Sequence, residues 1–471
     1  MMYKSFAEVK LALTSGVSLL DIVETYLQRI EASKDLNAFL EVFTDTVKAD
    51  ALRVQDKIVN GKAGKLAGMV VGIKDNICYK GHKVSASSRI LEGFESLYTA
   101  TALQRLLDED AIVIGRLNCD EFAMGSSNEN SAYGPVKNAL DYNRVPGGSS
   151  GGSSSAVAGN LCTVALGSDT GGSIRQPASF TGTYGIKPTY GRISRYGLIA
   201  YASSFDQIGV FANTLDDTAL VTEIMSGKDE HDSTSSSKQV LPLTCTPTKE
   251  KLNIAYIQET IDNDGIDNEV KQRMLDIIEQ LRAEGHRVES VSFPYMEYMV
   301  PTYYVLSTAE ASSNLSRFDG VHYGYRSKDA VGVEATYKKS RSEGFGTEVK
   351  RRIMAGTFVL SHGYYDAYYT KGQKVRRVLQ DKTKEIFTNF DVVLTPTTPS
   401  TAFELNAVKD PIQMYLQDIF TVHANLTGNP AISLPLGTSN DGLPFGIQVM
   451  TAPFTETLLF DFSAHLVQLV N

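Results

Sequence analysis

One segment of the chain contains two clusters that are rich in glycine and serine. It opens with Gly147-Gly148-Ser149-Ser150-Gly151-Gly152-Ser153 and closes with Gly167-Ser168-Asp169-Thr170-Gly171-Gly172-Ser173-Ile174-Arg175-Gln176-Pro177-Ala178. A short apolar run, residues 156–166, separates the two clusters. Glycine lets the backbone adopt positive φ and turn its N–H groups toward a bound group, while serine supplies a nucleophile or a proton relay. The segment therefore has the composition of a site that attacks a carbonyl and holds the resulting oxyanion.

Three other interpretations of these clusters compete with that one. Glycine–serine runs are often flexible linkers, but a linker has no reason to contain a core-like apolar run followed by a second cluster. Residues 147–151 also match G-x-S-x-G, the nucleophile elbow, which needs a preceding strand and a downstream histidine. Pro146 and its polar neighbours are not typical of a buried strand. Neither cluster ends in Gly-Lys-Ser/Thr, so a P-loop is excluded.

The composition is that of an ordinary soluble protein. The 471 residues are 42% hydrophobic and 21% charged, with a net charge of −9. This negative charge argues against direct binding of nucleic acid by the chain's own surface, although a basic partner could supply it. The four cysteines form no C-x-x-C motif and no zinc-ligand spacing, so we expect no metal site. No signal region and no run long enough to cross a membrane are present, and we expect a cytoplasmic protein.

The apolar patterns predict an α/β fold: a large mixed, mostly parallel sheet covered by helices on both faces. Helices are expected within residues 5–60, where Ser18 is an N-cap, and over 99–109, 214–225, 269–283, 295–379, 416–426 and 455–469. Strands are expected at 66–73, 111–114, 161–166, 252–257, 286–293, 391–394, 431–436 and 445–450. We expect a single domain over residues 1–471, with a helical region over 1–62, a core over 63–225 and a helical cover over the active site at 295–380.

A serine nucleophile needs a base, and the sequence offers an unusual one. The seven histidines all lie far from the glycine–serine segment in the chain. Lys74 follows the predicted strand at 66–73, so its side chain is expected to emerge from the buried sheet. Lysine is useful as a base only when burial or neighbouring cations lower its pKa enough to make it neutral near pH 7. Lys74 is therefore the best-placed candidate base.

Three motifs, at residues 72–76, 146–153 and 167–175, together resemble those of the amidase signature family. The resemblance covers essentially the whole chain. It implies a catalytic triad of Lys74, Ser149 in a cis peptide bond, and Ser173 as the nucleophile. Backbone N–H groups that face the oxyanion are expected at Thr170, Gly171, Gly172 and Ser173. Asp169 and Arg175 are expected to brace the nucleophile loop by hydrogen bonds.

Segments at residues 187–198, 312–320 and 349–354 resemble one branch of that family, the glutaminase subunits of tRNA-dependent amidotransferases. The resemblance implies that Arg352 binds the α-carboxylate of L-glutamine, that Asp418 binds its α-ammonium, and that Tyr303 lies near the ligand. Arginine suits the first role because its planar fork binds a carboxylate bidentately.

The same resemblance implies a heterotrimer with a B and a C subunit. This chain would release ammonia from glutamine and would need no cofactor. The B subunit would contact the misacylated tRNA, which is Glu-tRNA(Gln) and in many organisms also Asp-tRNA(Asn), and would use ATP and Mg²⁺ to convert it to the amide. Two rival hypotheses remain at this point. One is a stand-alone amidase that acts on a free small amide, against which the pairing of Arg352 with Asp418 argues. The other is a scaffold subunit with an inactive site, against which the intact triad argues.

Overall fold

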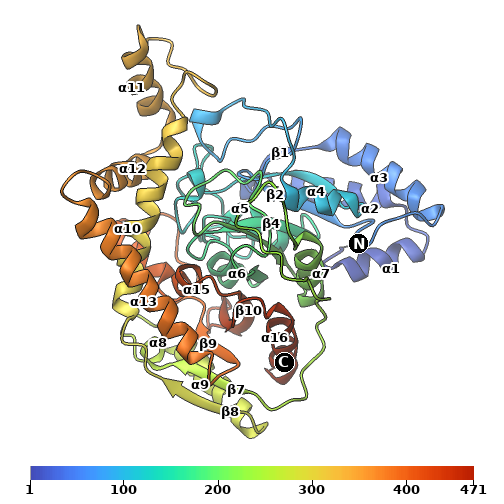
Figure 1. Cartoon of the computed structure of the whole chain (residues 1–471). Helices are drawn as coiled ribbons and strands as arrows, with labels where there is room; N and C mark the ends of the chain where they lie inside the picture. The colour runs from blue at the N-terminus through green and yellow to red at the C-terminus, as the bar shows by residue number, and fades with distance from the viewer. Residues whose placement is uncertain (1, 471) are drawn as a thin grey trace.

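The computed structural model describes residues 2–470 and is organised around one twisted sheet of eleven strands (Figure 1). From one edge to the other the strands are β1 (Phe39–Val42), β3 (Ile112–Leu117), β2 (Val70–Lys74), β4 (Val164–Asp169), β6 (Gln207–Ala212), β5 (Tyr184–Lys187), β10 (Ala431–Thr438), β11 (Pro444–Thr451), β9 (Val392–Pro396), β7 (Asn253–Ile257) and β8 (Arg287–Val291). The central strands are buried along their whole length, which explains their continuous apolar runs.

The sheet is mixed, as predicted, but it is not mostly parallel. Among the described residues, four strand pairings are parallel and six are antiparallel. The parallel pairings flank β2 and β7, the two places where a helix connects neighbouring strands. Between them, β10 and β11 form a hairpin whose turn contains Gly442 at φ +78°, and their neighbours run antiparallel to them. Three strands that the sequence analysis did not predict, β5, β6 and β1, which lies within residues 5–60 expected to be helical, contribute four of the six antiparallel pairings.

Helices cover both faces of the sheet, as predicted. One layer is formed by α4 (Thr101–Asp108), α7 (Leu215–Met225), α16 (Glu456–Val470) and α9 (Asn268–Ala283), in which each helix contacts the next. The other begins with α5 (Gly151–Ala158) and α6 (Arg175–Thr181), which contact each other and the central strands. The remaining short elements are α8 (Gln258–Ile261), α14 (Pro411–Tyr415), α15 (Val422–Thr427), and η1 (Lys34–Leu36), η2 (Arg89–Leu91), η3 (Glu121–Ala123), η4 (Leu315–Arg317), η5 (Asp366–Thr370) and η6 (Leu416–Asp418).

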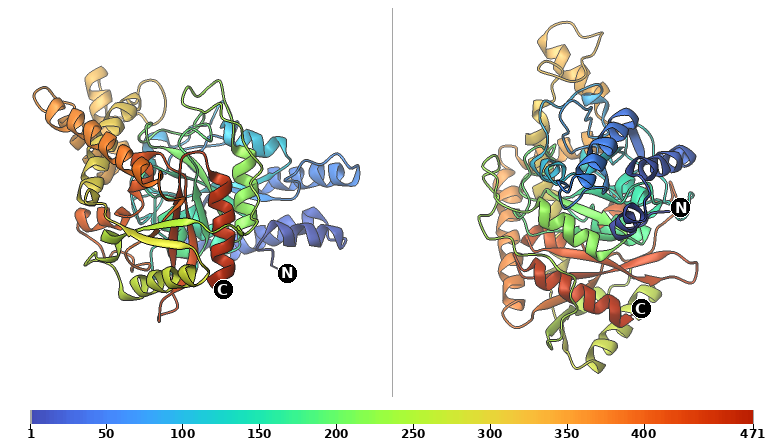
Figure 2. Two further views of the ribbon diagram at one scale, coloured as in Figure 1. Left: turned by 60° about the horizontal axis from the view of Figure 1, so that its bottom comes forward. Right: turned by 90° about the vertical axis from the view of Figure 1, so that its right-hand side faces the viewer.

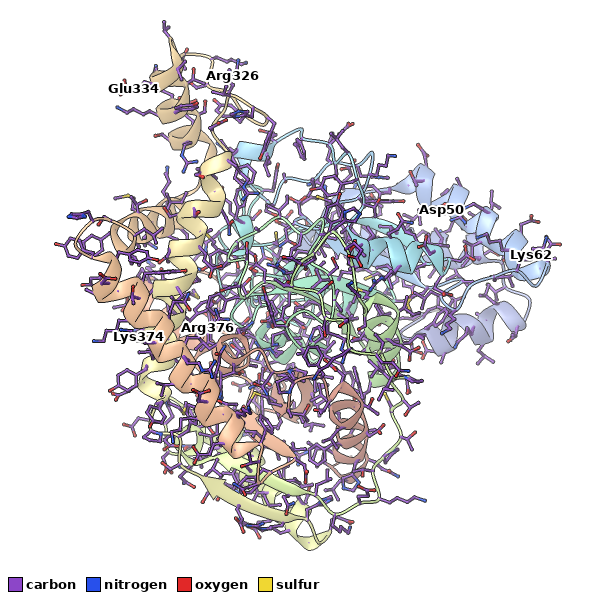
Figure 3. The ribbon with its side chains drawn as sticks, viewed as in Figure 1. Asp50, Lys62, Arg326, Glu334, Lys374 and Arg376 are labelled. Carbon is purple, nitrogen blue, oxygen red and sulfur yellow. The ribbon has the colours of Figure 1, made fainter. Side chains whose placement is uncertain are left out.

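Two helical regions lie at opposite ends of the molecule (Figures 1 and 2). The N-terminal helices α1 (Phe6–Thr14), α2 (Leu19–Ala32) and α3 (Thr44–Val59) lie at one end, beside β1. The helical cover at the other consists of α10 (Met296–Asn314), α12 (Thr347–Val359) and α13 (Lys371–Ile386), while α11 (Val333–Gly344) projects away from the body. Figure 3 shows Arg326 and Glu334 on this projection and Lys374 and Arg376 on α13. Helix α10 packs against α12, α13 and α15, and its buried residues share one hydrophobic cluster with residues of β7 and β9, which attaches the cover to the sheet.

Several local predictions are confirmed and others need correction. Thr214 caps α7, because its Oγ accepts a hydrogen bond from the backbone N–H of Asp217 at 3.2 Å. Residues 416–426 were predicted as one helix but form η6 and α15, with a break at residues 419–421. Helix α5 begins inside the first glycine–serine cluster, which is therefore not a linker. No helix within residues 2–470 is long and apolar enough to cross a membrane.

Candidate active site

Lys74 is the last residue of β2 and has no exposed surface. Because β2 lies between β3 and β4, the side chain at its end emerges into the interior of the protein. The amine Nζ lies 2.7 Å from Ser149 Oγ, 2.9 Å from Ser150 Oγ and 2.9 Å from Ser168 Oγ. Burial lowers the pKa of Lys74 to about 8, although nearby acidic groups act in the opposite direction. A lysine with this pKa is neutral in a usable fraction of molecules near pH 7.

The segment that carries Ser149 is packed against two other loops. The peptide bond between Gly148 and Ser149 is cis, as the family resemblance implied. The backbone N–H of Gly148 donates to Gln176 Oε1 at 3.0 Å, and the Ser149 carbonyl accepts from the N–H of Asp120 at 3.0 Å. A Cβ at Gly148 would lie 2.2 Å from Asp120 Oδ2, so no larger residue fits at this position. The glycines therefore serve close backbone packing, not flexibility.

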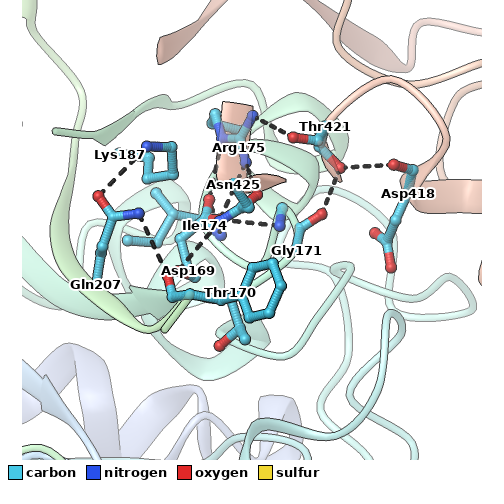
Figure 4. Close-up of polar contacts among 12 residues, drawn as sticks. Asp169, Thr170, Gly171, Ile174, Arg175, Lys187, Gln207, Asp418, Thr421 and Asn425 are labelled. Atoms are coloured by element: carbon cyan, nitrogen blue, oxygen red, sulfur yellow. Dashed lines mark hydrogen bonds and ion pairs between the residues drawn. The ribbon is translucent and has the colours of Figure 1, made fainter. Parts of the chain in front are cut away.

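Ser173 lies in the loop between β4 and α6, and its side chain reaches the protein surface only slightly. Asp169 holds this loop by accepting from the N–H groups of Gly172 at 2.9 Å and Ile174 at 3.2 Å. Arg175 in turn binds both oxygens of Asp169 at 3.0 Å (Figure 4). Burial alone would raise the pKa of Asp169, but Arg175 keeps it below the usual value. Gln176 connects the loop to Gly148, which places Ser173 on the same side of the sheet as Ser149.

One of the four predicted oxyanion donors is wrong. The N–H of Gly172 points to the Asp169 carboxylate, so it is not free to bind an oxyanion. The geometry leaves the N–H groups of Thr170, Gly171 and Ser173. Position 171 is restricted to glycine, because a Cβ there would lie 2.5 Å from the ring of Tyr303. The Thr170 hydroxyl donates to Asp206 Oδ1 at 2.7 Å, which anchors the start of the loop.

Arg352 on α12 lies in a cage of three tyrosine rings. The guanidinium carbon lies 5.6 Å from the ring centre of Tyr201, 5.2 Å from that of Tyr304 and 5.4 Å from that of Tyr415. Its Nε donates to Glu348 Oε1 at 2.8 Å, and its Nη1 donates to the Tyr201 hydroxyl at 2.8 Å. Within residues 2–470, Nη2 makes no hydrogen bond. The side chain lines a pocket of about 250 Å³ together with Glu348 and Tyr415.

Asp418 at the end of η6 is buried and only half satisfied. Its Oδ2 accepts from the Ser126 hydroxyl at 2.6 Å. Its Oδ1 is buried and has no hydrogen-bond partner in the described part of the chain. Burial raises the pKa of Asp418 to about 7, although Ser126 and Arg352 act in the opposite direction. Burying a carboxylate oxygen without a hydrogen-bond donor is unfavourable in free energy. Oδ1 therefore marks a place where a bound group would supply the donor.

The structure thus brings the predicted residues together in two adjacent groups. Lys74 and Ser149 are joined by a hydrogen bond, and the Ser173 loop packs against the same segment. Tyr303 lies between the groups, because its ring abuts Gly171 and its centre is 5.0 Å from that of Tyr304 in the arginine cage. Among the predicted site residues in the described chain, Arg352 alone lines the 250 Å³ pocket.

Sequence reasoning missed five residues that complete this site. Glu348 stands four positions before Arg352 on one helix, a spacing from which charge patterning could have predicted the ion pair. Ser126 belongs to a Gly-Ser-Ser-Asn run that resembles the other glycine–serine clusters and could have been noticed. Tyr201, Tyr304 and Tyr415 carry no local signal, because only the folded chain brings them to Arg352.

The sequence was compared with those of known protein families and proteins. The amidase family model matches residues 21–460. The A subunit of glutamyl-tRNA(Gln) amidotransferase from Chlorobaculum tepidum is 49% identical over 476 residues, which cover 99% of this chain and 98% of that protein. The protein of the same name from Fusobacterium nucleatum is 48% identical over 451 residues, with 95% and 92% covered.

Two solved structures share the fold. The crystal structure of the A subunit of glutamyl-tRNA(Gln) amidotransferase from Thermotoga maritima superimposes with a TM-score of 0.79 at 40% identity, covering 95% of this chain and 91% of that one. Peptide amidase from Stenotrophomonas maltophilia superimposes with a TM-score of 0.82 at 26% identity, covering 99% and 96%. The fold therefore serves both a free amidase and one component of an amidotransferase, and the site must distinguish the two.

Proposed function

The chain belongs to the amidase family, and we propose that it is the A subunit of a glutamyl-tRNA(Gln) amidotransferase, in which it hydrolyses glutamine to supply ammonia. Two kinds of support agree. Relatives that carry this name match nearly the full length of the chain at 48–49% identity. The site also offers a free cationic donor on Arg352 and a free anionic acceptor on Asp418, which suit the two charges of a free amino acid.

In the reaction, Ser173 Oγ attacks the side-chain amide carbon of glutamine. Ser149 accepts the proton of Ser173 and passes its own proton to neutral Lys74. The protonated relay then returns a proton to the leaving nitrogen, and ammonia departs from a glutamyl ester on Ser173. Water attacks the ester by the same relay, releases glutamate and restores the free serine. The lowered pKa of Lys74 supports its role as the base.

The hydrogen bonds around Lys74 support Ser149, and not Ser150, as the proposed relay. The Ser150 hydroxyl donates its hydrogen to the Ser168 carbonyl at 3.1 Å and accepts from the Ser168 N–H at 3.3 Å. Its oxygen can therefore only accept from Lys74, at 2.9 Å. Within the described residues Ser149 Oγ has a hydrogen bond only with Lys74 Nζ, so its hydrogen can transfer to the amine 2.7 Å away.

The oxyanion of the tetrahedral intermediate is proposed to bind the backbone N–H groups of Thr170, Gly171 and Ser173. A donor in this role typically stabilises the transition state by about 3–4 kcal/mol. The loop is held in place beforehand, because Asp169 binds the intervening N–H of Gly172 and Arg175 fixes Asp169. Such prior ordering is what makes the donors effective when charge develops.

Glutamine selectivity is proposed to come from Arg352 on α12 and Asp418 on η6. The free Nη2 of Arg352 binds the α-carboxylate, and Oδ1 of Asp418 accepts from the α-ammonium. Tyr303 packs between them and the nucleophile loop and fixes the depth to which the side chain enters. The unpaired Asp418 Oδ1 is the single observation that carries this proposal, since a neutral amide would leave it without a partner.

We further propose that the chain works as a cytoplasmic heterotrimer with a B and a C subunit. The B subunit would contact the misacylated tRNA and use ATP and Mg²⁺ to activate its acyl group, while this chain binds no cofactor. The net charge of −9 is consistent with leaving the tRNA to a partner.

A stand-alone amidase is the alternative, and the similarity to peptide amidase favours it. One experiment separates the two functions. The chain is co-expressed with its B and C subunits, and release of glutamate from glutamine is measured together with amide transfer to Glu-tRNA(Gln). We expect both activities, and a kcat/KM for glutamine at least about 100-fold above that for propionamide. Equal turnover of both amides, with no transfer to tRNA, would establish the free amidase instead.

A further inference from the structure

Glu121 in η3 is a buried carboxylate that the proposed reaction does not use. It is 2% exposed, and within residues 2–470 it forms no ion pair. One oxygen, Oε1, accepts a hydrogen bond from the Ser88 hydroxyl. The other, Oε2, accepts from the backbone N–H of Gly346 at 2.8 Å. Because a buried charge without a counter-ion is unfavourable, these two contacts need an explanation.

The contact with Gly346 places Glu121 at the start of α12. Gly346 is the residue that precedes this helix, and its N–H belongs to the group that a helix leaves without an internal partner. A negative charge at this end also interacts favourably with the helix dipole. Glu121 therefore caps α12 from a different part of the chain, 225 residues away.

The fit at this junction is close. A Cβ at Gly346 would lie 2.3 Å from Glu121 Oε2, so only glycine allows the approach. The ring of Phe345 packs edge-on against that of Phe122, with ring centres 5.7 Å apart. A Cβ at Gly344 would lie 2.6 Å from the Ile90 side chain in η2. The core elements η2 and η3 thus form a seat for the residues that connect α11 to α12.

Arg352 is six residues further along the same helix, a rise of about 9 Å. Helix α12 also packs against α10, which is itself part of the helical cover. The seat at Glu121 therefore attaches the Arg352 helix directly to the catalytic core. The same core loop continues to Ser126, which holds Asp418 at 2.6 Å. Both proposed contacts to the amino-acid end of glutamine are thus fixed from residues 121–126.

We propose that Glu121 is a positioning residue for glutamine binding, which holds the first turn of α12 against the catalytic core and thereby sets the place of Arg352. This inference rests on the proposed role of Arg352 in binding the α-carboxylate. Burial raises the pKa of Glu121 to about 7, although Ser88 and Gly346 lower it and Lys350 and Arg89 are the cations that face it. The carboxyl group therefore tolerates the neutral form, and the hydrogen bonds matter more than the charge. Glutamine at this position keeps an oxygen acceptor for Gly346 and is expected to replace it.

The test uses three substitutions at this position in the full chain, purified with its B and C subunits. Glu121→Asp is one methylene too short to reach Gly346, Glu121→Ala removes the acceptor, and Glu121→Gln keeps it. We expect the first two to raise the KM for glutamine about tenfold while leaving kcat/KM for propionamide within about twofold. Glu121→Gln should remain within about twofold of the wild type for both substrates.

Ser340→Ala is the matched control, because Ser340 is buried in the adjacent α11 and its Oγ accepts from the N–H of Ser327 at 3.0 Å, with no side-chain hydrogen bond to α12 within residues 2–470. It should leave the KM for glutamine unchanged. Parallel losses for glutamine and propionamide in Glu121→Asp, or no rescue by Glu121→Gln, would overturn the positioning role. A wild-type protein that does not prefer glutamine would refute the proposed function itself, and so the two failures are distinguishable. Should Glu121→Ala fail to fold, the comparison of Glu121→Asp with Glu121→Gln still tests the positioning role.

Discussion

The nucleophile loop and the helical cover each contain a buried arginine paired with a carboxylate. The two arginines differ in how many of their N–H donors are already used in hydrogen bonds within the protein. Arginine has five N–H donors. Arg175 uses all of them. Two bind Asp169, one binds Thr421 O at 2.8 Å and one binds Asn425 Oδ1 at 2.6 Å (Figure 4). The fifth binds Gln448 Oε1 at 2.6 Å. Arg352 donates one hydrogen bond to Glu348 and one to Tyr201 within the described chain.

The number of N–H donors in use separates an arginine that supports the structure from one that can bind a substrate. A guanidinium that is saturated by the protein, as Arg175 is, can only hold its neighbours in place. One with free N–H groups beside a pocket, as Arg352 is, has a binding capacity that the fold itself does not use. A second carboxylate of the site, Asp418 on η6, repeats the contrast: both oxygens of Asp169 are bonded, whereas Oδ1 of Asp418 has no partner in the described chain. The loop is therefore complete without substrate, whereas Arg352 and Asp418 are not.

Removal of the nucleophile should produce the largest effect and should not depend on the substrate. Ser173→Ala is expected to lower kcat about ten-thousand-fold or more for both glutamine and propionamide, because the loop acts on the amide group common to both. Steady-state hydrolysis of the two amides provides the measurement. Ser153→Ala is the control, since Ser153 lies in the same segment but donates to the Leu166 carbonyl, away from Lys74. Retained turnover in Ser173→Ala would mean that the nucleophile is another residue.

Removal of the binding arginine should affect glutamine alone. The double variant Arg352→Met with Glu348→Gln avoids leaving the largely buried Glu348 carboxylate with only the exposed Arg351 as its counter-ion. It is expected to raise the KM for glutamine about 100-fold, the loss of a charge-assisted bidentate contact, with kcat/KM for propionamide within about twofold. Arg175→Met should instead impair both substrates and lower the melting temperature. If the two arginine variants behaved alike, the contrast between support and binding would be wrong.

A sequence can predict the loop far better than the cover, for a physical reason. Lys74, Ser149 and Ser173 lie within 100 residues of one another, on or after neighbouring strands, and each belongs to a contiguous motif. The nature of the Lys74 base also follows from its place at the end of a buried strand. The cage around Arg352 is assembled from Tyr201, Tyr304 and Tyr415, which no local pattern connects. Even within the loop, which N–H of residues 170–173 faces Asp169 depends on backbone torsion that residue types do not specify.

The pH dependence should distinguish the two regions by its slope. Catalysis needs neutral Lys74, whose pKa is about 8, so kcat/KM for propionamide should rise about tenfold per pH unit up to that value. Glutamine also needs ionised Asp418, whose pKa is about 7. Below pH 7 its kcat/KM should therefore rise about 100-fold per unit, because two protons must be lost from the free enzyme. Asp418→Asn should return the slope for glutamine to the single-proton value, and an unchanged steep slope would exclude Asp418 as the ammonium site.

The smallest effect is expected from the carboxylate that orients Arg352. In Glu348→Gln the amide oxygen still accepts from Nε, and the three tyrosine rings and the Tyr201 hydroxyl still hold the guanidinium. The KM for glutamine should rise only about threefold to fivefold, the worth of a neutral in place of a charged hydrogen bond. Arg351→Gln, which removes the more exposed partner of Glu348, should change it less than twofold. Asp169→Asn is the counterpart in the loop and should be far more harmful, because both of its oxygens are needed as acceptors for Gly172, Ile174 and Arg175. A stronger effect at Glu348 than at Asp169 would reverse the assignment of support and binding to the two regions.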